Sequence, residues 1–351
     1  MTHDILFAQA FRGGHVESCY YGAIAVVDST QKVVFAAGDI TTPVFPRSTV
    51  KALQALPFVA EGAADRFSFP EEALALACAS HQGEPAHIAT ISDMLTRLGL
   101  DHNALECGSH WPLDTTATHT LIAAGKKACA LHNCCSGKHA GLISLACALH
   151  HNFQGYTHPD HPVIQRVART LAHITQSPHT ETNLGIDGCS LPTWAIPLTA
   201  LALAFARFAT GTYLPNDYAT AAARLRTAIS RHPFMVAGSH QFDTLILQEL
   251  APRVLTKMGA EGVMTIALPE QGLGIALKCR SGHIQATEAA AAAMIQRFGK
   301  IENPVLTHFM GRKLKNWNGQ EVGKLLVARD LQAKTSLYSY GYHLAEQQNP
   351  V

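Results

Sequence analysis

The sequence predicts an α+β fold in which one antiparallel sheet, flanked by helices, is built from both ends of the chain. Three features indicate this: strand-like runs near the N-terminus, a long central region with apolar residues at helical spacing, and strand-like runs again toward the C-terminus. Because strands from the two ends can complete one sheet, the middle is predicted to be an inserted, mainly helical lobe. We expect a sheet domain of residues 1–70 and 240–351 and a helical domain of residues 71–239.

The N-terminal part of the sheet is predicted to be an antiparallel meander. Turn-forming residues, among them Gly13-Gly14, separate three runs rich in β-branched and aromatic residues. These runs are Ile5–Phe11, Tyr20–Val27 and Val33–Ala37. Pro46 then interrupts the chain just before an apolar stripe at helical spacing, so we expect a helix to begin at Ser48.

The central region is predicted to be helical because apolar residues recur at helical spacing through five segments. The segments are Ile88–Leu98, Ala140–Leu149, Val163–Ile174, Leu198–Phe208 and Ala219–Ile229. Beyond Phe242–Leu250, three short runs between turns are predicted as strands, and an alanine-rich helix follows from about Glu288 to Phe298. The three runs are Val263–Ala267, Gly274–Lys278 and His283–Ala286. The segment Asn303–Val351 either completes the sheet or contacts a partner subunit.

Composition and charge exclude several classes of partner. With 27 Lys and Arg residues against 26 Asp and Glu, the formal charge of +1 gives no broad field to attract nucleic acid or an anionic membrane. The N-terminus has no signal-peptide pattern, and the most apolar stretch, Ala195–Ala206, is too short to span a bilayer. We therefore expect a cytoplasmic protein with no membrane or nucleic-acid partner. Its nine cysteines are expected to be reduced thiols, most of them in the core.

Ser48 and Lys51 are the first candidate catalytic pair. They stand three residues apart, so both project from one face of the first turn of the predicted helix. A serine hydroxyl is a weak nucleophile until a base takes its proton, and a lysine amine whose pKa is depressed by burial or a neighbouring cation can serve as that base. The alternative is that Ser48 caps a helix and Lys51 is solvated, because S-x-x-K is a common pattern.

Two further segments support catalysis over a helix cap. Lys257-Met258-Gly259, directly before a predicted strand, resembles the K-[ST]-G motif that accompanies S-x-x-K in penicillin-recognising enzymes. Cys78–Glu84 follows an apolar run and forms a polar, glycine-containing turn typical of the edge of a cleft. Ser80 in this turn is a candidate second hydroxyl, although an ordinary helix end with a capping serine fits the same residues.

A group of cysteines and histidines forms the third candidate. Cys135 and His139 stand four residues apart, which would align them on one face of a helix opposite Cys189. Thiolate and imidazole are ligands that suit zinc. Because free cysteines are often simply buried in a core, a structural role explains the same pattern equally well.

Taken together, five segments in order along the chain resemble the zinc-containing L-asparaginase II family, also called rhizobial-type asparaginases. The segments are Pro46–Lys51, Cys78–Glu84, Asn133–His139, Gly185–Cys189 and Lys257–Gly262. The resemblance runs nearly from end to end. It implies the fold shared by penicillin-recognising serine hydrolases, serine β-lactamases and glutaminases, and an enzyme that hydrolyses L-asparagine to L-aspartate and ammonia without a nucleotide or organic cofactor.

The resemblance also implies a role for each site residue. Ser48 attacks the side-chain amide of asparagine and Lys51 activates it, while Ser80 and Lys257 form a second Ser–Lys pair. The resemblance implies a zinc ion bound by Cys135, Lys138, Cys189 and a water molecule. The residues implied nearest the substrate are Arg47, His139 and Asp187. A homodimer is also implied.

Two questions remain open from the residues alone. Ligand chemistry by itself favours His139 over Lys138, because a lysine ligand must be neutral, and two thiolates with Zn²⁺ would have to overcome its ordinary pKa near 10.4. The function also has alternatives: a glutaminase, a β-lactam-recognising hydrolase, or a non-catalytic zinc-binding regulatory protein in which Ser48 only caps a helix.

Overall fold

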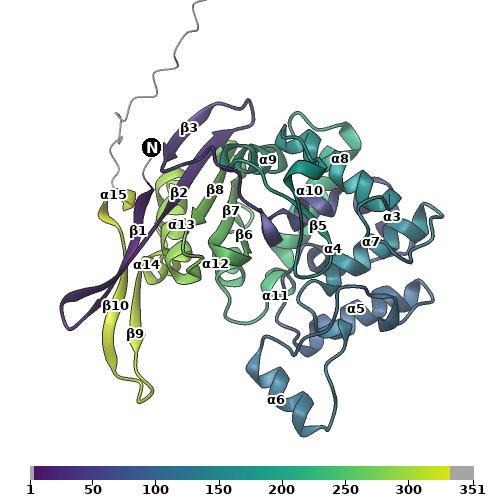
Figure 1. Ribbon diagram of the computed structural model, residues 1–351, viewed down its shortest axis with the longest axis horizontal. Helices are drawn as coiled ribbons and strands as arrows, with labels where there is room; N and C mark the ends of the chain where they lie inside the picture. The colour runs from purple at the N-terminus through teal and green to yellow at the C-terminus, as the bar shows by residue number, and fades with distance from the viewer. Residues whose placement is uncertain (1–3, 333–351) are drawn as a thin grey trace, which may run out of the picture.

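An eight-stranded antiparallel sheet contains strands from both ends of the chain, as the sequence predicts. The computed structural model describes residues 4–332, and in it the strand order is β6-β7-β8-β2-β1-β10-β9, with β3 also beside β2. Figure 1 shows this sheet on one side of the molecule and most of the helices on the other. The strands are β1 Ile5–Arg12, β2 His15–Asp28, β3 Val33–Ala37, β6 Leu255–Gly259, β7 Val263–Leu268, β8 Leu273–Cys279, β9 Gly311–Lys315 and β10 Glu321–Val327.

The first hairpin confirms the predicted turn at Gly13-Gly14. Both glycines have positive φ, 54° and 82°, a conformation that glycine adopts without steric cost. Strand β2 begins at His15, five residues before the predicted Tyr20, because its first residues pair with β1 in the register Arg12↔His15. Side chains there are exposed or half-buried, so backbone pairing rather than burial defines that end of the strand.

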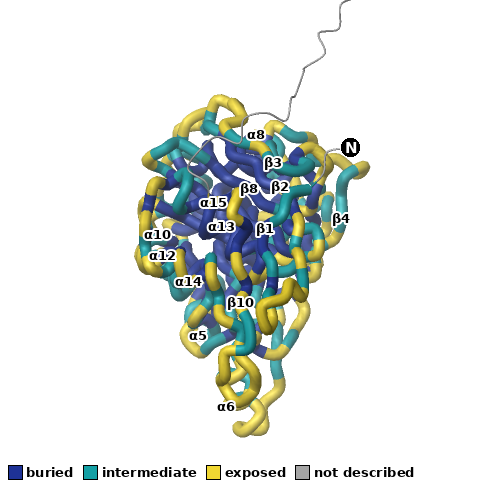
Figure 2. The backbone as a smooth tube through the Cα atoms, turned by 90° about the vertical axis from the view of Figure 1, so that its left-hand side faces the viewer, coloured by how far each residue is buried: buried dark blue, intermediate teal, exposed yellow. Residues whose placement is uncertain are grey.

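The two faces of the sheet bury two separate hydrophobic clusters. Successive side chains of β2 alternate between them: Ala23 and Ala25 belong to one cluster, and Ile24 and Val26 to the other. Helix α9 (Leu198–Thr210) covers the first face and helix α13 (Ile284–Gly299) the second. Figure 2 shows the resulting buried centre around β2, β8 and α13. The site residues lie on the α9 side, where the helical part of the chain meets the sheet.

Gly274 of β8 lets the sheet approach α9 closely. A Cβ at this position would overlap the carbonyl oxygen of Ala202 and the amide nitrogen of Ala206. We expect Gly274→Ala to lower the free energy of unfolding by about 1–3 kcal/mol, the usual cost of overpacking. Gly311→Ala is the control, because its Cβ would meet only ordinary contacts. Urea denaturation measures both, and equal stability of the two variants would contradict the close approach.

The remaining described elements are mostly helices, and the predicted helical segments coincide with α5, α7, α8, α9 and α10. The α-helices are α1 Lys51–Gln54, α2 Leu56–Ala60, α3 Ala63–Arg66, α4 Glu71–Ala77, α5 Pro85–Arg97, α6 Thr115–Ala123, α7 Ser136–Ala148, α8 Pro162–Thr175, α10 Asn216–Arg231, α11 Pro233–Ala237, α12 Phe242–Leu250, α14 Pro304–Met310 and α15 Arg329–Gln332. The 3₁₀ turns are η1 Arg47–Val50, η2 His102–Ala104, η3 Ala130–His132, η4 Glu181–Asn183, η5 Ala260–Gly262 and η6 Pro269–Gln271. A small hairpin, which the sequence did not suggest, is formed by β4 Leu184–Ile186 and β5 Pro192–Trp194.

Helices α1 and α2 pack against helices of the central region. Helix α1 contacts α8, and α2 contacts α7, α8 and α10, although these residues precede position 70. The proposed division into residues 1–70 with 240–351 and residues 71–239 stays a prediction. Helix α6 and its flanking loops extend away from the rest, and none of the α6 residues is buried.

The strand predicted at His283–Ala286 is wrong. His283 is instead the N-cap of α13, and its Nδ1 accepts a hydrogen bond from the backbone N–H of Ala286 at 3.1 Å. This cap starts the helix four residues before the predicted Glu288, because it satisfies an amide that the first turn leaves free.

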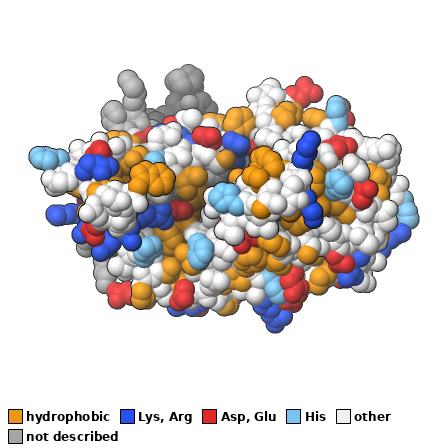
Figure 3. Space-filling view, turned by 90° about the horizontal axis from the view of Figure 1, so that it is seen from below, with side chains coloured by type: hydrophobic (Ala, Val, Ile, Leu, Met, Phe, Trp, Pro, Cys, Tyr) orange, Lys and Arg blue, Asp and Glu red, His pale blue; other side chains and the backbone are white. Residues whose placement is uncertain are grey.

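The C-terminal segment completes the sheet, one of the two outcomes expected for Asn303–Val351. Strand β10 pairs antiparallel with β1, and β9 follows at the edge. Residues 333–351 lie outside the described residues. Within 4–332, none of the helices combines the length and apolar character that a membrane crossing requires. Figure 3 shows basic, acidic and histidine side chains interspersed over one face of the molecule.

Candidate active site

The hydroxyl of Ser80 lies between two buried lysine amines. Lys51 Nζ donates to Ser80 Oγ at 3.0 Å, and Lys257 Nζ donates to the same oxygen at 3.1 Å. Lys51 comes from the start of α1, Ser80 from the turn after α4, and Lys257 from β6. Three motifs that are far apart in the sequence therefore meet at one oxygen atom.

Lys51 is fully buried and its amine has three acceptors. Besides Ser80, the amine donates to the carbonyl oxygens of Ala79 at 2.5 Å and Cys134 at 3.5 Å. Three acceptors match the three N–H donors of a lysine ammonium. The side chain thus ties the turn after α4 to the segment that leads into α7.

Ser48 lies half-buried in the 3₁₀ turn η1 rather than at an α-helix start. Its carbonyl oxygen accepts the backbone N–H of Lys51, but its hydroxyl makes no hydrogen bond to another residue in the range 4–332. The amine of Lys51 is hydrogen-bonded to Ser80 instead. The predicted nucleophile–base pairing of Ser48 and Lys51 therefore stays a prediction.

Local packing places η1 beside strand β6. Thr49 Oγ1 donates to the carbonyl oxygen of Pro46 at 2.7 Å and so closes the turn. A Cβ on Gly259 would lie 3.0 Å from that oxygen and 3.0 Å from Thr49 Cγ2, tighter than ordinary contact. The glycine of the Lys257-Met258-Gly259 motif is thus needed where the strand passes the Ser48 turn.

Lys257 has an electrostatic environment that favours its neutral form. Burial lowers the pKa of its amine, the carboxylate of Asp243 opposes this, and the positive charge of Lys51 lowers it further, for a net lowering. The amine also donates to the carbonyl oxygen of Met258 at 2.9 Å. A buried lysine amine with a lowered pKa can accept a proton more readily near neutral pH than an ordinary lysine.

His81 fixes the backbone on either side of the site. Its Nδ1 accepts the N–H of Gly83 at 3.0 Å, so the hydrogen-bond network assigns the proton to Nε2, which donates to Ser136 Oγ at 2.9 Å. Burial lowers the pKa of His81 well below its ordinary value, which keeps the ring neutral. The His81 N–H also donates to Cys134 O at 3.2 Å, joining the Ser80 turn to the start of α7.

The three predicted zinc ligands are brought together by α7 and the β4–β5 hairpin. Lys138 Nζ donates to Cys189 Sγ at 3.0 Å. Cys135 lies at the N-cap of α7, and its pKa is lowered. The hydrogen bond with Cys134 contributes most to this lowering, and the one with Cys189 comes second. Burial lowers the pKa of Lys138, but the adjacent Cys189 and Cys135 outweigh it, so the net shift is upward.

The donor chemistry of this set agrees with zinc only in part. Two cysteine thiolates are typical zinc ligands, whereas a lysine amine is not, and Lys138 would have to lose its proton against its raised pKa to bind a metal. Within residues 4–332, no three histidine, cysteine, aspartate or glutamate side chains are grouped to hold a metal ion. The set of Cys135, Lys138 and Cys189 contains only two such side chains, its third being an amine.

The three predicted substrate-binding residues lie on neighbouring segments. Arg47 Nε donates to Asp187 Oδ1 at 2.8 Å, and both side chains are partly buried. His139 is fully buried, with Nδ1 hydrogen-bonded to the hydroxyl of Tyr156 at 2.6 Å. Its Nε2 is buried and has no hydrogen-bond partner among the described residues, an unusual state for a buried polar atom. Tyr156 carried no sequence signal, since it occurs outside every motif.

A family model described as L-asparaginase II matches residues 8–327, which is most of the chain. The chain belongs to the L-asparaginase II family. No curated protein sequence matches it.

Solved structures similar to this L-asparaginase II family member are distant in sequence. One, described as Mglu in its native form, is 13% identical, with 84% of this chain and 69% of that chain covered and a TM-score of 0.47. A β-lactamase from Mycobacterium bovis is 13% identical, with 79% and 95% covered and a TM-score of 0.40. A putative β-lactamase from Bacteroides dorei is 14% identical, with 74% and 84% covered and a TM-score of 0.37.

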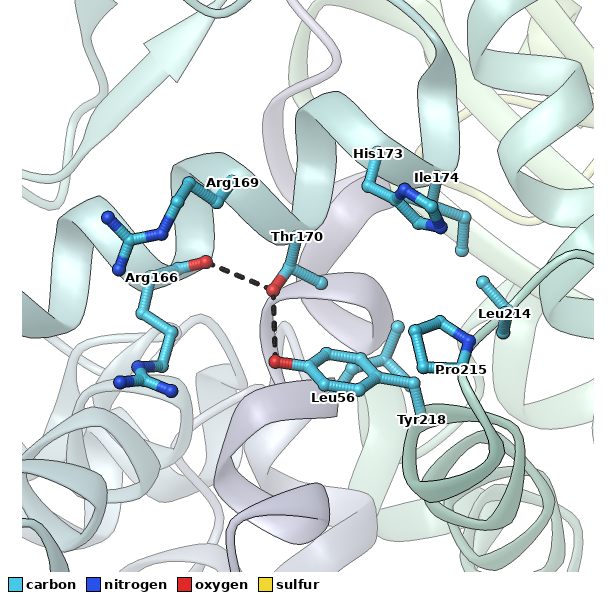
Figure 4. Close-up of a pocket in the computed structure, with 9 residues that line it drawn as sticks. All are labelled: Leu56, Arg166, Arg169, Thr170, His173, Ile174, Leu214, Pro215 and Tyr218. Atoms are coloured by element: carbon cyan, nitrogen blue, oxygen red, sulfur yellow. Dashed lines mark hydrogen bonds between the residues drawn. The ribbon is translucent and has the colours of Figure 1, made fainter.

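The protein also has a cavity of about 190 Å³ that is lined by none of the predicted site residues. Figure 4 shows it between α8 and the segment before α10, with Thr170 hydrogen-bonded to the Tyr218 hydroxyl. Arg166 at its edge is already paired with Glu61 at 2.8 Å. The lining residues are Leu56, Arg166, Arg169, Thr170, His173, Ile174, Leu214, Pro215 and Tyr218. The hydroxyl groups in this lining, those of Thr170 and Tyr218, are hydrogen-bonded to each other.

Proposed function

We propose that this protein is an L-asparaginase that hydrolyses L-asparagine to L-aspartate and ammonia through an acyl-enzyme on Ser48. The observation that carries the proposal is the hydroxyl of Ser80 held between the buried amines of Lys51 and Lys257, in a chain of the L-asparaginase II family. Paired hydroxyls and amines in a buried site are the components of serine-based amide hydrolysis without a histidine base.

In the proposed first step, the amine of Lys51 passes a proton through the hydroxyl of Ser80 to the amine of Lys257. Lys51 then takes the proton of Ser48 Oγ as that oxygen attacks the side-chain carbonyl carbon of asparagine. The C–N bond then breaks and the nitrogen leaves as ammonia after receiving that proton. The hydroxyl of Ser80 connects the amine of Lys51 to that of Lys257, so a proton can be exchanged between the two lysines. Water then attacks the carbonyl carbon of the ester, and the proton transfers run in the reverse direction, which releases aspartate and restores the Ser48 hydroxyl.

Substrate recognition is proposed to use the charged groups beside this centre. The guanidinium of Arg47 suits the α-carboxylate of asparagine, and the carboxylate of Asp187 suits its α-ammonium group. In the structure these two side chains neutralise each other at 2.8 Å, and an amino acid carries both complementary charges to replace that contact. His139 Nε2, buried and unpartnered in the described chain, is proposed to bind the substrate as well.

We propose that Cys135, Lys138 and Cys189 hold a zinc ion. When bound, the ion would position the substrate, while the nucleophile comes from serine. Lys138 would have to give up its proton to bind the metal. A homodimeric, cytoplasmic enzyme is the form that we propose, without a nucleotide or organic cofactor.

Ammonia release tests the proposal directly. The purified protein is incubated with asparagine or glutamine, with ammonia as the product measured, and with a β-lactam, whose ring opening releases no ammonia and is followed by absorbance. Each substrate is tested once with zinc supplied and once after chelation. We expect ammonia from asparagine. After chelation we expect a higher KM in a protein that stays folded, with a melting temperature lowered only by the loss of the bound ion. Preference for glutamine would instead identify a glutaminase, and preference for the β-lactam would identify a β-lactam-recognising hydrolase. Absence of turnover, combined with unfolding on chelation, would instead identify a zinc-dependent structural module.

A further inference from the structure

Asp243 is a buried carboxylate that faces the lysine of the second Ser–Lys pair. It lies in the first turn of α12, and its side chain is 2% exposed. Oδ2 accepts the backbone N–H of Met258 at 2.8 Å and lies 3.6 Å from Lys257 Nζ. Oδ1 is buried and has no hydrogen-bond partner within residues 4–332.

Such a carboxylate is costly for the fold. A buried charge with an unsatisfied oxygen loses its hydration without full replacement, and apolar residues of similar volume are often at least as stable as a buried ion pair. The neighbouring Phe242 and Ile246 of α12 belong to the hydrophobic cluster that α13 covers. Stability alone therefore gives a weak reason for an aspartate here.

We propose that Asp243 is a positioning residue that holds the amine of Lys257 against Ser80 and controls how readily that amine loses its proton. This inference rests on the proposed function, because it assigns Lys257 a role in proton transfer. The carboxylate acts on Lys257 in two ways: by anchoring the backbone of the next residue, Met258, and by direct attraction of the amine.

The charges around Lys257 fix the direction of the effect. Burial and Lys51 favour the neutral amine, while Asp243 and, more weakly, Cys134 and Cys135 favour the ammonium. Glu288, which interacts electrostatically with Asp243, is paired with Arg312 at 2.6 Å. Because Asp243 is the strongest influence toward the ammonium form, its neutralisation moves the titration of Lys257 to lower pH.

Asp243→Asn is the decisive variant, with Glu288→Gln as the matched control. Asparagine keeps an oxygen to accept the Met258 N–H but has no charge. Glu288→Gln also removes a buried carboxylate near Asp243, but one whose partner is Arg312. The titration of Lys257 is followed by NMR on protein with ¹³Cε-labelled lysine, with the resonance assigned through Lys257→Arg.

We expect Asp243→Asn to lower the titration midpoint of Lys257 by about 1–3 on the pH scale, the usual effect of an opposite charge at this distance. The acidic limb of kcat/KM for asparagine should move in the same direction, while KM changes little. Glu288→Gln should leave both midpoints close to those of the wild type. An unchanged Lys257 midpoint in Asp243→Asn would overturn the proposal.

The NMR titration separates this proposal from the proposed function. If the Lys257 midpoint is lowered in Asp243→Asn but the wild-type protein releases no ammonia from any substrate, the proposed role of Asp243 is supported and asparaginase activity is rejected. If Asp243→Asn does not fold, it is combined with Lys257→Met. Recovery of folding in the double variant supports the pairing, because both members are then neutral, whereas a double variant that is no more stable than Asp243→Asn contradicts it.

Discussion

Replacing Ser48 with alanine is expected to reduce turnover of asparagine by at least about 10³-fold, the scale seen when a covalent nucleophile is removed. Without Oγ no acyl-enzyme can form, and no neighbouring group restores the lost bond. The fold should be unaffected, because Ser48 is half-buried and its hydroxyl makes no hydrogen bond to another described residue. Steady-state ammonia release, with melting temperature measured in parallel, checks both statements.

Ser80 provides the comparison for Ser48. Its hydroxyl contacts both lysine amines, so Ser80→Ala should slow proton exchange but leave the acylated serine in place. Acid quenching during turnover followed by peptide mass mapping locates the aspartyl group. We expect it on the peptide that contains Ser48. Finding the aspartyl group on Ser80 would make that residue the nucleophile. Wild-type turnover in Ser48→Ala would show that Ser48 is not the nucleophile.

Much of the fold could be predicted from local patterns because periodicity and turn residues act over short distances. The glycine pair at 13–14 and the five helical segments of the central region are examples. His283–Ala286 was mistaken for a strand because four residues are too few to show a period. The decisive interaction, the imidazole of His283 capping the Ala286 N–H, depends on a side-chain rotamer that the sequence does not display.

The site could be predicted as a set of motifs but not as a set of contacts. Spacing suggested that Lys51 meets Ser48, yet its amine is hydrogen-bonded to Ser80 and to the carbonyl oxygens of Ala79 and Cys134. Backbone carbonyls have no sequence signature, so these acceptors could not be foreseen. Asp243 was missed for a related reason, since an acidic residue in the first turn of a helix is commonly explained by the helix dipole.

Replacing Lys257 with methionine is expected to reduce kcat for asparagine by about 10²–10⁴-fold, the usual contribution of a positioned general base. Methionine fills similar space in this buried site but cannot accept a proton. Because burial and Lys51 lower the pKa of Lys257 below that of an ordinary lysine, its neutral fraction increases as pH rises through this lowered pKa. Wild-type kcat/KM should therefore rise with pH on its acidic side, and this limb should disappear in Lys257→Met.

Lys257→Arg separates the two ways in which Lys257 can act. Arginine keeps the positive charge beside Ser80, but its pKa is too high for it to serve as a base at neutral pH. If Lys257 transfers a proton, the arginine variant should be as inactive as the methionine variant. An arginine variant with near wild-type kcat would show that only the charge matters. Lys313→Met, on exposed strand β9, is the control for loss of a lysine and should retain full activity.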